Sequence, residues 1–218
     1  MSIRALIVEE NPVARAFLAR VVRESFSDEI RFSEAQDLAS AREALGAAAG
    51  GEAAQDGFRL ILCDLEQPEL GGLELLAELG GYPAIKIATT LHSDDEHLFP
   101  ALQCGAQGYL LKEDRFEVLV EELQRIVRGQ PPLSPAMARR MLGHFRQQTE
   151  GAPAGAEPLS GREGEVLAYL AKGYTIKEIA RLLGIKWLAV NEHIHAAYRK
   201  LALTSARDTV LAGRRAMT

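Results

Sequence analysis

Residues 60–78, with the sequence LILCDLEQPELGGLELLAE, decide the fold of this chain. Four apolar residues at 60–63 predict a short strand, and this strand ends on the carboxylate of Asp64. Pro68 and Gly71-Gly72 form a loop, and an amphipathic helix with several leucines follows. An unbroken apolar run indicates a strand buried on both faces, as in a parallel sheet covered by helices. Open parallel sheets carry their sites at the carboxyl ends of the strands, so Asp64 is the first candidate site residue.

The same alternation of strand and helix extends to both sides of this stretch. Apolar runs predict further strands at 4–8, 30–34, 85–90 and 108–111. Helices are expected from Asn11-Pro12 onward and at 39–45, 98–104 and 116–127. The low-complexity stretch 46–57 is expected to form a mobile surface loop. Five strands alternating with five helices predict an α/β doubly wound five-stranded parallel sheet.

Length, hydropathy and cysteine content limit the class of protein. The 218 residues suffice for one large domain or two ordinary ones. No apolar run approaches the roughly 18 residues that a membrane span needs, and no signal segment opens the chain. We therefore expect a cytoplasmic protein with no membrane partner. Cys63 and Cys104 lack metal-ligand spacing and are expected to be two buried thiols.

Net charge divides the chain into an acidic and a basic part. Residues 1–128 hold 12 Lys and Arg against 23 Asp and Glu, a balance of −11. Residues 129–157 hold three against two, or +1, and residues 158–218 hold ten against five, or +5. A basic last part indicates an acidic partner such as DNA, although a solvated basic surface would have the same composition.

The last 90 residues are predicted to be helical. A helix is expected at about 134–147, and residues 149–158 have the composition of a linker. Ser160 with Glu163 and Thr175 with Glu178 have capping-box spacing, and Ser205 with Asp208 is a looser variant. They predict helices at 161–172, 176–183 and 205–215, with a further helix at 187–201. We expect three parts: a domain at 1–128, a linker at 129–157 and a domain at 158–218.

The predicted strand ends bring polar side chains to one edge of the sheet. This edge receives Glu9 and Glu10, Asp64, Thr90 and Lys112. Clustered carboxylates repel one another unless a cation neutralises them, and ligands that are all oxygen suit Mg²⁺. An aspartate oxygen in such a site can attack phosphorus while Lys112 holds the phosphoryl oxygens.

These residues resemble the receiver domain of two-component response regulators, and the whole chain resembles the NarL/LuxR (FixJ) subfamily. The motifs are EENP at 9–12, LCDLEQPELGGLE at 62–74, TT at 89–90 and GAQGYLLK at 105–112. The resemblance implies a flavodoxin-like receiver in which Asp64 is the phosphoacceptor, Lys112 pairs with the phosphoryl group, and Thr90 with Tyr109 forms the switch. It also implies a Mg²⁺ site made by Glu9, Glu10, Asp64 and Glu66, where Glu9 acts through water and Glu66 through its carbonyl group. The family usually has an aspartate in the first acidic pair, where this chain has two glutamates.

Residues 158–218 resemble the four-helix, LuxR-type helix-turn-helix domain of the same subfamily. The closest match is LSGREGEVLAYLAKGYTIKEIARLLGI at 159–185. The resemblance implies a recognition helix at 187–201 and dimer contacts at 204–215. The histidine at 193 matches one that the family keeps, and packing within the domain is favoured for it over the alternative, a DNA contact. The expected DNA-contacting residues are Lys177, Lys186, Asn191, His195, Arg199 and Lys200.

The recognition helix departs from the family pattern. Ala189 replaces a hydroxyl residue, Asn191 replaces a lysine, and Glu192 adds a charge that phosphates repel. Trp187 and Leu188 are apolar where a helix start facing the groove is usually polar. Because phosphate neutralisation dominates DNA affinity, weaker DNA binding than is usual in the family is expected.

The sequence thus predicts a response regulator and transcription factor that is not an enzyme acting on an outside substrate. Its expected partners are a sensor histidine kinase, promoter DNA and a second copy of the chain. The first alternative is an atypical regulator that binds DNA weakly or is not phosphorylated and acts through protein contacts. The second is a Mg²⁺-dependent phosphatase or nucleotide-binding protein, against which the absence of GxGxxG and GxxxxGK[ST] motifs argues.

Overall fold

The computed structural model describes residues 3–27, 29–49, 57–66, 71–92, 95–130, 135–151 and 157–215. Its first part is a single parallel sheet in the order β2-β1-β3-β4-β5. The strands are β1 (Ile3–Val8), β2 (Ile30–Ala35), β3 (Leu60–Asp64), β4 (Ile85–Thr90) and β5 (Gly108–Leu111). The doubly wound parallel sheet predicted from the sequence is confirmed.

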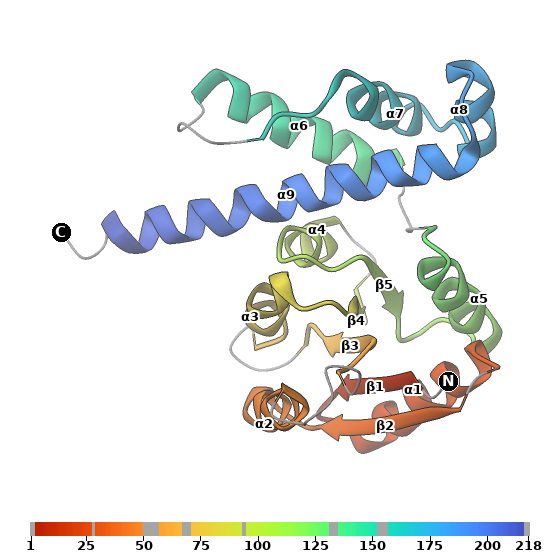
Figure 1. Cartoon of the computed structure of the whole chain (residues 1–218), viewed down its shortest axis with the longest axis vertical. Coiled ribbons are helices and arrows are strands. Elements are labelled where there is room, and N and C mark those ends of the chain that lie inside the picture. The colour runs from red at the N-terminus through yellow and green to blue at the C-terminus, as the bar shows by residue number, and fades with distance from the viewer. Residues whose placement is uncertain are drawn as a thin grey trace.

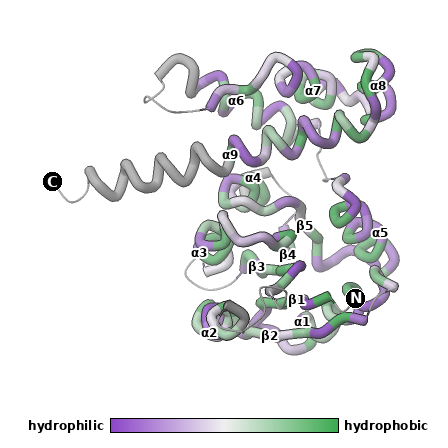
Figure 2. The backbone as a smooth tube through the Cα atoms, in the orientation of Figure 1, coloured by the Kyte–Doolittle hydropathy of each residue, from purple (hydrophilic) through white to green (hydrophobic). Residues whose placement is uncertain are grey.

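Helices cover both faces of this sheet (Figure 1). One face carries α1 (Pro12–Ser25) and α5 (Phe116–Val127), which pack together over the strand residues Ala5, Ile7 and Leu62. The other face carries α2 (Leu38–Ala49), α3 (Gly71–Glu78), the short 3-10 helix η2 (Leu79–Gly81) and α4 (Asp95–Gln103). Alternate strand residues point to opposite faces, and because both faces are covered, residues 60–63 of the central strand β3 are apolar without interruption, as predicted, whereas the edge strand β2 includes Arg31, Ser33 and Glu34. The amphipathic helices, α5 for example, alternate hydrophobic and hydrophilic residues (Figure 2).

Four helices follow the sheet: α6 (Pro135–Gly151), α7 (Gly161–Ala171), α8 (Ile176–Leu183) and α9 (Trp187–Arg215). Both predicted capping boxes are present, Ser160 with Glu163 before α7 and Thr175 with Glu178 before α8. Gly184 ends α8 in the left-handed region at φ 65°, which a glycine adopts without steric cost. The turn between α8 and α9 therefore follows directly from the sequence.

Some predicted helix boundaries were wrong. Residues 46–49 were predicted to be a loop but belong to α2, because alanine has a high helix propensity. Residues 50–56 of the predicted loop lie outside the described residues. The separate helix expected at 205–215 is the continuation of α9. No glycine or proline interrupts residues 202–212, so the Ser205–Asp208 spacing alone does not start a new helix. Of the predicted linker, 149–151 extend α6 and 152–156 are not described.

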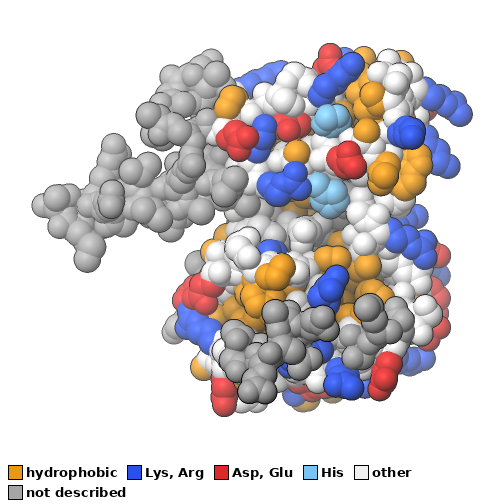
Figure 3. All heavy atoms as spheres, viewed as in Figure 1, with side chains coloured by type: hydrophobic (Ala, Val, Ile, Leu, Met, Phe, Trp, Pro, Cys, Tyr) orange, Lys and Arg blue, Asp and Glu red, His pale blue; other side chains and the backbone are white. Residues whose placement is uncertain are grey.

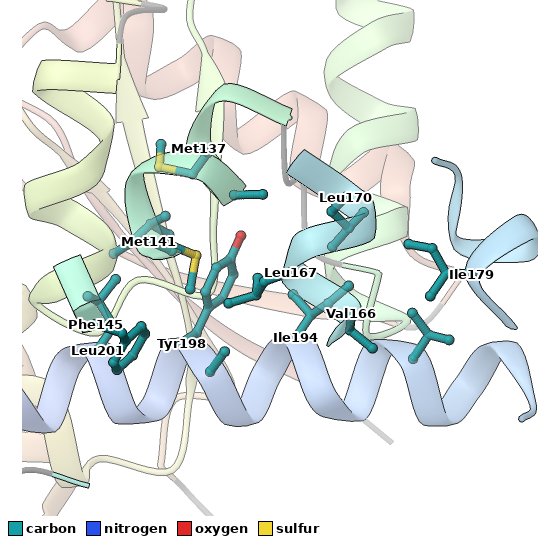
Figure 4. Packing of buried hydrophobic residues seen from close by; sticks show 14 of the residues in the cluster. Met137, Met141, Phe145, Val166, Leu167, Leu170, Ile179, Ile194, Tyr198 and Leu201 are labelled. Atoms are coloured by element: carbon teal, nitrogen blue, oxygen red, sulfur yellow. The ribbon is translucent and has the colours of Figure 1, made fainter. Parts of the chain in front are cut away.

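One apolar cluster joins the helical part to the sheet-containing part. It contains Met137, Met141 and Phe145 of α6, residues of α7, α8 and α9, and also residues of α4. Figure 4 shows the ring of Tyr198 on α9 lying beside the two methionines of α6. On the α4 side, Leu98, Phe99 and Leu102 belong to the same cluster. The two parts are therefore packed together, with α9 lying across α4 (Figure 1).

Within the described residues, no helix has the length and apolar character to cross a bilayer. Both cysteines are free thiols; Cys63 is buried and Cys104 is half-buried.

Candidate functional site

An acidic pocket lies at the carboxyl edge of the sheet. Asp64 is the last residue of β3 and is 3% exposed, and Glu9 directly follows β1 and is 2% exposed. Between β1 and β3 the strand order reverses, which is the place where open α/β sheets bind their ligands. The sheet topology thus brings together two carboxylates that are 55 positions apart in the sequence.

Lys112 is the cation at the centre of this pocket. It follows β5, and its Nζ atom lies 2.6 Å from Asp64 Oδ1, 2.8 Å from Glu9 Oε2 and 3.1 Å from Glu66 Oε2. The Lys112 side chain is only 11% exposed. One buried lysine therefore pairs with three carboxylates, and its removal would leave uncompensated buried charge.

The Glu66 carboxylate links Lys112 to the end of β4. Its Oε1 atom accepts hydrogen bonds from the Thr90 hydroxyl at 2.6 Å and from the Leu91 backbone N–H at 2.8 Å. Thr90 is fully buried, and its oxygen also accepts a hydrogen bond from the backbone of His92. The neighbouring Thr89 hydroxyl is buried without a hydrogen-bond partner, so Thr90 is the threonine that faces the pocket.

The loop after β1 is fixed by local hydrogen bonds. Glu9 Oε1 accepts from the backbone N–H of Asn11, whose own side chain caps α1. Arg15 donates to the carbonyl oxygens of Glu9 at 2.7 Å and of Glu10 at 3.2 Å. The Glu10 side chain is exposed at the rim. The two adjacent glutamates therefore differ in environment: Glu9 points to Lys112 and Glu10 to solvent.

Burial and the close charges set the pKa values in the pocket. Burial and the contact with Glu66 raise the pKa of Asp64, although Lys112 opposes this. Burial also tends to raise the pKa of Glu66, but its hydrogen bonds lower this pKa overall; its partners are Asp64, Thr90, Leu91 and Lys112. Burial disfavours the charged form of Lys112, yet its bonds to Asp64 and Glu9 raise its pKa. The adjacent thiol of Cys63 is inert at neutral pH, because burial raises its pKa to about 12.

Gly72 is required by the close approach of α3 to β3. A Cβ atom at this position would lie 2.0 Å from the Asp64 carbonyl oxygen, a distance that no side chain tolerates. The second glycine of the pair thus has a structural reason: it lets the first turn of α3 lie against the residue that ends β3.

The side chains of the pocket suit Mg²⁺, since their carboxylates offer only oxygen atoms as metal ligands. In the described residues, however, no three acidic or histidine side chains are arranged to enclose an ion. Lys112 occupies the space between Glu9, Asp64 and Glu66. Of the predicted ligands, Glu9 and Asp64 pair with Lys112 and Glu10 is exposed, so the set of Glu9, Glu10, Asp64 and the Glu66 carbonyl group stays a prediction from the family resemblance.

Tyr109, in β5, packs against two apolar clusters at once. It contacts the cluster beneath α2, α3 and α4, and also the cluster of the C-terminal helices. Tyr198 of α9 lies close enough that Tyr109, together with burial, raises its pKa. Tyr109 is thus a direct physical link between the sheet and α9.

The expected DNA-contacting residues fall into four environments, of which that of Lys200 is described separately below. Lys177 and Lys186 are exposed, and basic side chains gather at the end of the molecule where α8 lies (Figure 3). Asn191 is 1% exposed, and both polar atoms of its side chain lack a hydrogen-bond partner. His195 and Arg199 line a cavity of about 310 Å³ opposite the ends of α5 and the starts of β4 and β5.

Lys200 has an internal role in the helical part. Its Nζ atom pairs with Glu163 at 2.9 Å and donates to the carbonyl oxygen of Pro158 at 3.0 Å. Its side chain is 14% exposed. This lysine therefore ties α9 to the start of α7, and its charge is not presented to a phosphate backbone in this arrangement.

Sequence reasoning missed three residues of these sites. The Glu66 side chain was overlooked because only its carbonyl group was considered, although an acidic residue two positions after Asp64 was a visible signal. Arg15 was missed because its hydrogen bonds to backbone carbonyls have no sequence motif. Gln107 was missed because the cavity beside His195 forms only when the two parts of the chain pack together.

Comparisons with known proteins agree with this architecture. Residues 5–124 match the family described as "Response regulator receiver domain", and residues 157–212 match "Bacterial regulatory proteins, luxR family". The oxygen regulatory protein NreC of Staphylococcus carnosus is 32% identical over 87% of this chain and 90% of its own length. The transcriptional regulatory protein UhpA of Escherichia coli is 31% identical over 82% of each chain.

A crystal structure also shares the fold. The LuxR-family two-component response regulator from Aurantimonas sp. SI85-9A1 superposes with a TM-score of 0.52 at 21% identity, covering 66% of this chain and 98% of that one.

Proposed function

The chain belongs to the response regulators that join a receiver domain to a LuxR-type helix-turn-helix, and from this premise we propose that phosphorylation of Asp64 releases α9 to bind DNA. Members of this family are DNA-binding regulators of transcription and not enzymes acting on an outside substrate. The proposal assigns the receiver to 1–128, the linker to 129–157 and the DNA-binding domain to 158–218. The cell location proposed is the cytoplasm.

The observation that carries the proposal is the position of Tyr109. Its ring lies on both the receiver core and the core of the C-terminal helices. Its strand, β5, pairs with β4, which ends in Thr90. A rearrangement of Thr90 in β4 would therefore act on the neighbouring strand β5. That strand carries Tyr109, which packs against the cluster that includes residues of α9. Bistable packing of this kind converts a small local shift into separation of two parts.

The phosphoryl group would reach Asp64 from the phosphohistidine of a sensor kinase or from a small acyl phosphate. An Asp64 oxygen forms the new O–P bond, and the bond from phosphorus to the donor breaks. The donor leaves with that electron pair, as a histidine that takes up a proton or as a carboxylate. Lys112 balances the added charge, and bound Mg²⁺, which the family typically uses, would neutralise phosphoryl oxygens.

In the packed arrangement, the polar face of α9 is turned toward the receiver. Asn191 is buried, and His195 and Arg199 face the receiver across the cavity. A recognition helix needs such a face free to enter the major groove. Domain separation is therefore a requirement for base contacts by these residues, and two separated chains would pair on a two-fold DNA site through residues 204–215.

The test measures phosphorylation and separation in one preparation of the full chain. Acetyl phosphate with Mg²⁺ should add one phosphoryl unit by intact mass and increase the radius of gyration in X-ray scattering. The same treatment should increase retention of a random-sequence DNA duplex pool. Asp64→Asn should show none of these changes. Arg199→Ala should still gain the phosphoryl mass and expand, but it should retain less DNA. A phosphorylated chain that neither expands nor binds more DNA would overturn the proposal.

A second candidate is an atypical regulator that acts through protein contacts. The observation in its favour is the set of exposed apolar side chains at the end of the helix-turn-helix, Leu182, Trp187 and Leu188, which are 47–54% exposed. Retention of a partner protein that depends on Trp187 and Leu188, without DNA binding, would favour it.

A further inference from the structure

Glu66 uses both oxygens of its carboxylate inside the pocket. Oε1 accepts the hydrogen bonds of the Thr90 hydroxyl and the Leu91 backbone N–H. Oε2 is buried and forms an ion pair with Lys112, 3.1 Å from its Nζ atom. One side chain thus engages a hydroxyl, a backbone amide and an ammonium group at the end of β4 and β5.

A phosphoryl group on Asp64 would enter the pocket that Lys112 shares between Asp64 and Glu66. Lys112 is 2.6 Å from Asp64 Oδ1, and the Glu66 backbone N–H donates to that same oxygen at 3.2 Å. A phosphoryl group brings three strong acceptor oxygens and about two negative charges. Its donors in this pocket would be Lys112 and the Glu66 N–H, together with the Thr90 hydroxyl and the Leu91 N–H that now donate to the Glu66 carboxylate.

These donors cannot serve both acceptors fully. A threonine hydroxyl and a backbone amide each have one proton to donate. While Glu66 accepts both protons, a phosphoryl group on Asp64 would meet no free donor from β4 and would lie beside another negative charge. Glu66 must turn away before the group can be bound as resemblance to the family implies.

We infer that the Glu66 carboxylate occupies the phosphoryl position in the unphosphorylated chain and competes with the group for Thr90, Leu91 and Lys112. Glu66 is a positioning residue, because it acts through these donors and not on phosphorus. It holds Thr90 toward the pocket without any phosphoryl group, and it sets how readily Asp64 accepts and keeps one. This inference rests on the proposed function and names the residue that regulates it.

The test uses fluoroberyllate, a non-covalent analogue of a phosphoryl group, at saturating Mg²⁺. Affinity for the full chain is measured by calorimetry for the wild type, Glu66→Ala and Glu66→Gln. Glu66→Ala should bind about tenfold more tightly or better, the factor that one hydrogen bond to a charged group is worth. Glu66→Gln should be intermediate, because its amide oxygen can still accept from Thr90 and Leu91 but has no charge. Glu122→Gln, which removes an exposed charge paired with Arg125 on α5, should match the wild type.

A second readout needs neither metal nor phosphoryl analogue. The amide proton of Leu91 donates to a carboxylate, so its resonance should lie downfield in the wild type and in Asp64→Asn. It should move upfield in Glu66→Ala. An unmoved Leu91 resonance would show that the carboxylate is not at that position and would overturn the inference.

The outcomes separate this inference from the proposed function. If the wild type and Glu66→Ala accept a phosphoryl group from acetyl phosphate and bind fluoroberyllate equally well, the inference is wrong and the proposed function stands. If only Glu66→Ala accepts the group, competition by Glu66 is supported in its strongest form. If neither protein accepts it, the proposed function fails and the inference fails with it.

Discussion

The two ends of the signalling path are built differently. The pocket around Lys112 is buried and ionic, and each of its carboxylates has a cationic or hydrogen-bonding partner. The contact between α9 and the receiver is apolar on the α4 side, where the C-terminal cluster includes Leu98, Phe99 and Leu102. On the other side it holds a pocket that is lined by the half-buried His195.

From this difference we expect the ionic pocket to keep its geometry and the contact between α9 and the receiver to be the one that separates. Breaking a satisfied buried ion network costs several kcal/mol, so the pocket keeps its geometry while a group is attached. The contact between α9 and the receiver combines an apolar cluster with a pocket beside His195, and the proposed function requires this contact, and not the ion network, to open on phosphorylation.

The largest effect is expected from Lys112→Met. It removes the only cation within ion-pair distance of the described Glu9, Asp64 and Glu66 carboxylates. The free energy of unfolding should fall by about 3–5 kcal/mol, as measured by urea denaturation of the full chain near pH 7. Arg42→Met is the control, because Arg42 pairs with Glu74 and Glu78 at the exposed surface. Equal losses in the two variants would contradict the contrast between buried and exposed ion pairs.

The next effect is expected from Gly72→Ala. The added methyl would lie 2.0 Å from the Asp64 carbonyl oxygen, so α3 must shift away from β3. Overpacking of this kind costs about 1–3 kcal/mol, and fluoroberyllate binding at Asp64 should weaken as well. Gly80→Ala is the matched control, since no atom lies within 4 Å of its added Cβ. If Gly72→Ala is as stable as Gly80→Ala, the close approach does not constrain the pocket.

Asn191→Leu changes a buried position of α9 at which a substitution should raise stability. Replacing a buried amide that has no hydrogen bonds by an apolar side chain of similar size should stabilise the packed form by about 1–3 kcal/mol. The thermal midpoint should rise, and phosphorylation should expand the chain less in X-ray scattering. Asn191→Asp, which buries a charge at the same position, should lower the midpoint. A loss of stability in Asn191→Leu would show that the amide has a favourable partner.

The smallest expected effect is a pH dependence of the packed form. Burial lowers the pKa of His195 below its ordinary value of 6.5, Arg199 lowers it further, and the backbone of Gly129 opposes them. The group also faces Gln107 and Glu192 across the cavity. Because the pKa is lower when packed, stability is complete above pH 6.5 and is lost as the pH falls toward and through the lowered pKa. Separation should thus increase toward pH 5.5.

His195→Gln should remove this part of the pH dependence. The measurement is the radius of gyration of the unphosphorylated chain between pH 7.5 and 5.5, compared for both proteins. Identical pH profiles would show that other groups cause any opening.

Much of the receiver could be predicted because its signals are local. The strand at β3 ends at Asp64, and α5 spans 116–127, as expected from the apolar pattern. Capping boxes started α7 and α8 at the predicted residues, since a cap satisfies backbone donors within one turn. The fusion of 187–201 with 205–215 was missed because a capping-box spacing also occurs inside a continuous helix, where only the course of the backbone decides.

The sequence by itself determined the parallel sheet, the gathering of Glu9, Asp64, Thr90 and Lys112 at one edge, and the helix-turn-helix with Gly184 at its turn. Hydrophobic periodicity, helix caps and strand ends depend on residues that are close together in the sequence, so they can be predicted from it directly. Only the tertiary structure decided that Glu9 and not Glu10 is buried with Lys112, that Glu66 reaches Thr90, and that Lys200 pairs with Glu163. Those outcomes depend on distances between elements far apart in sequence, which packing fixes and local pattern does not.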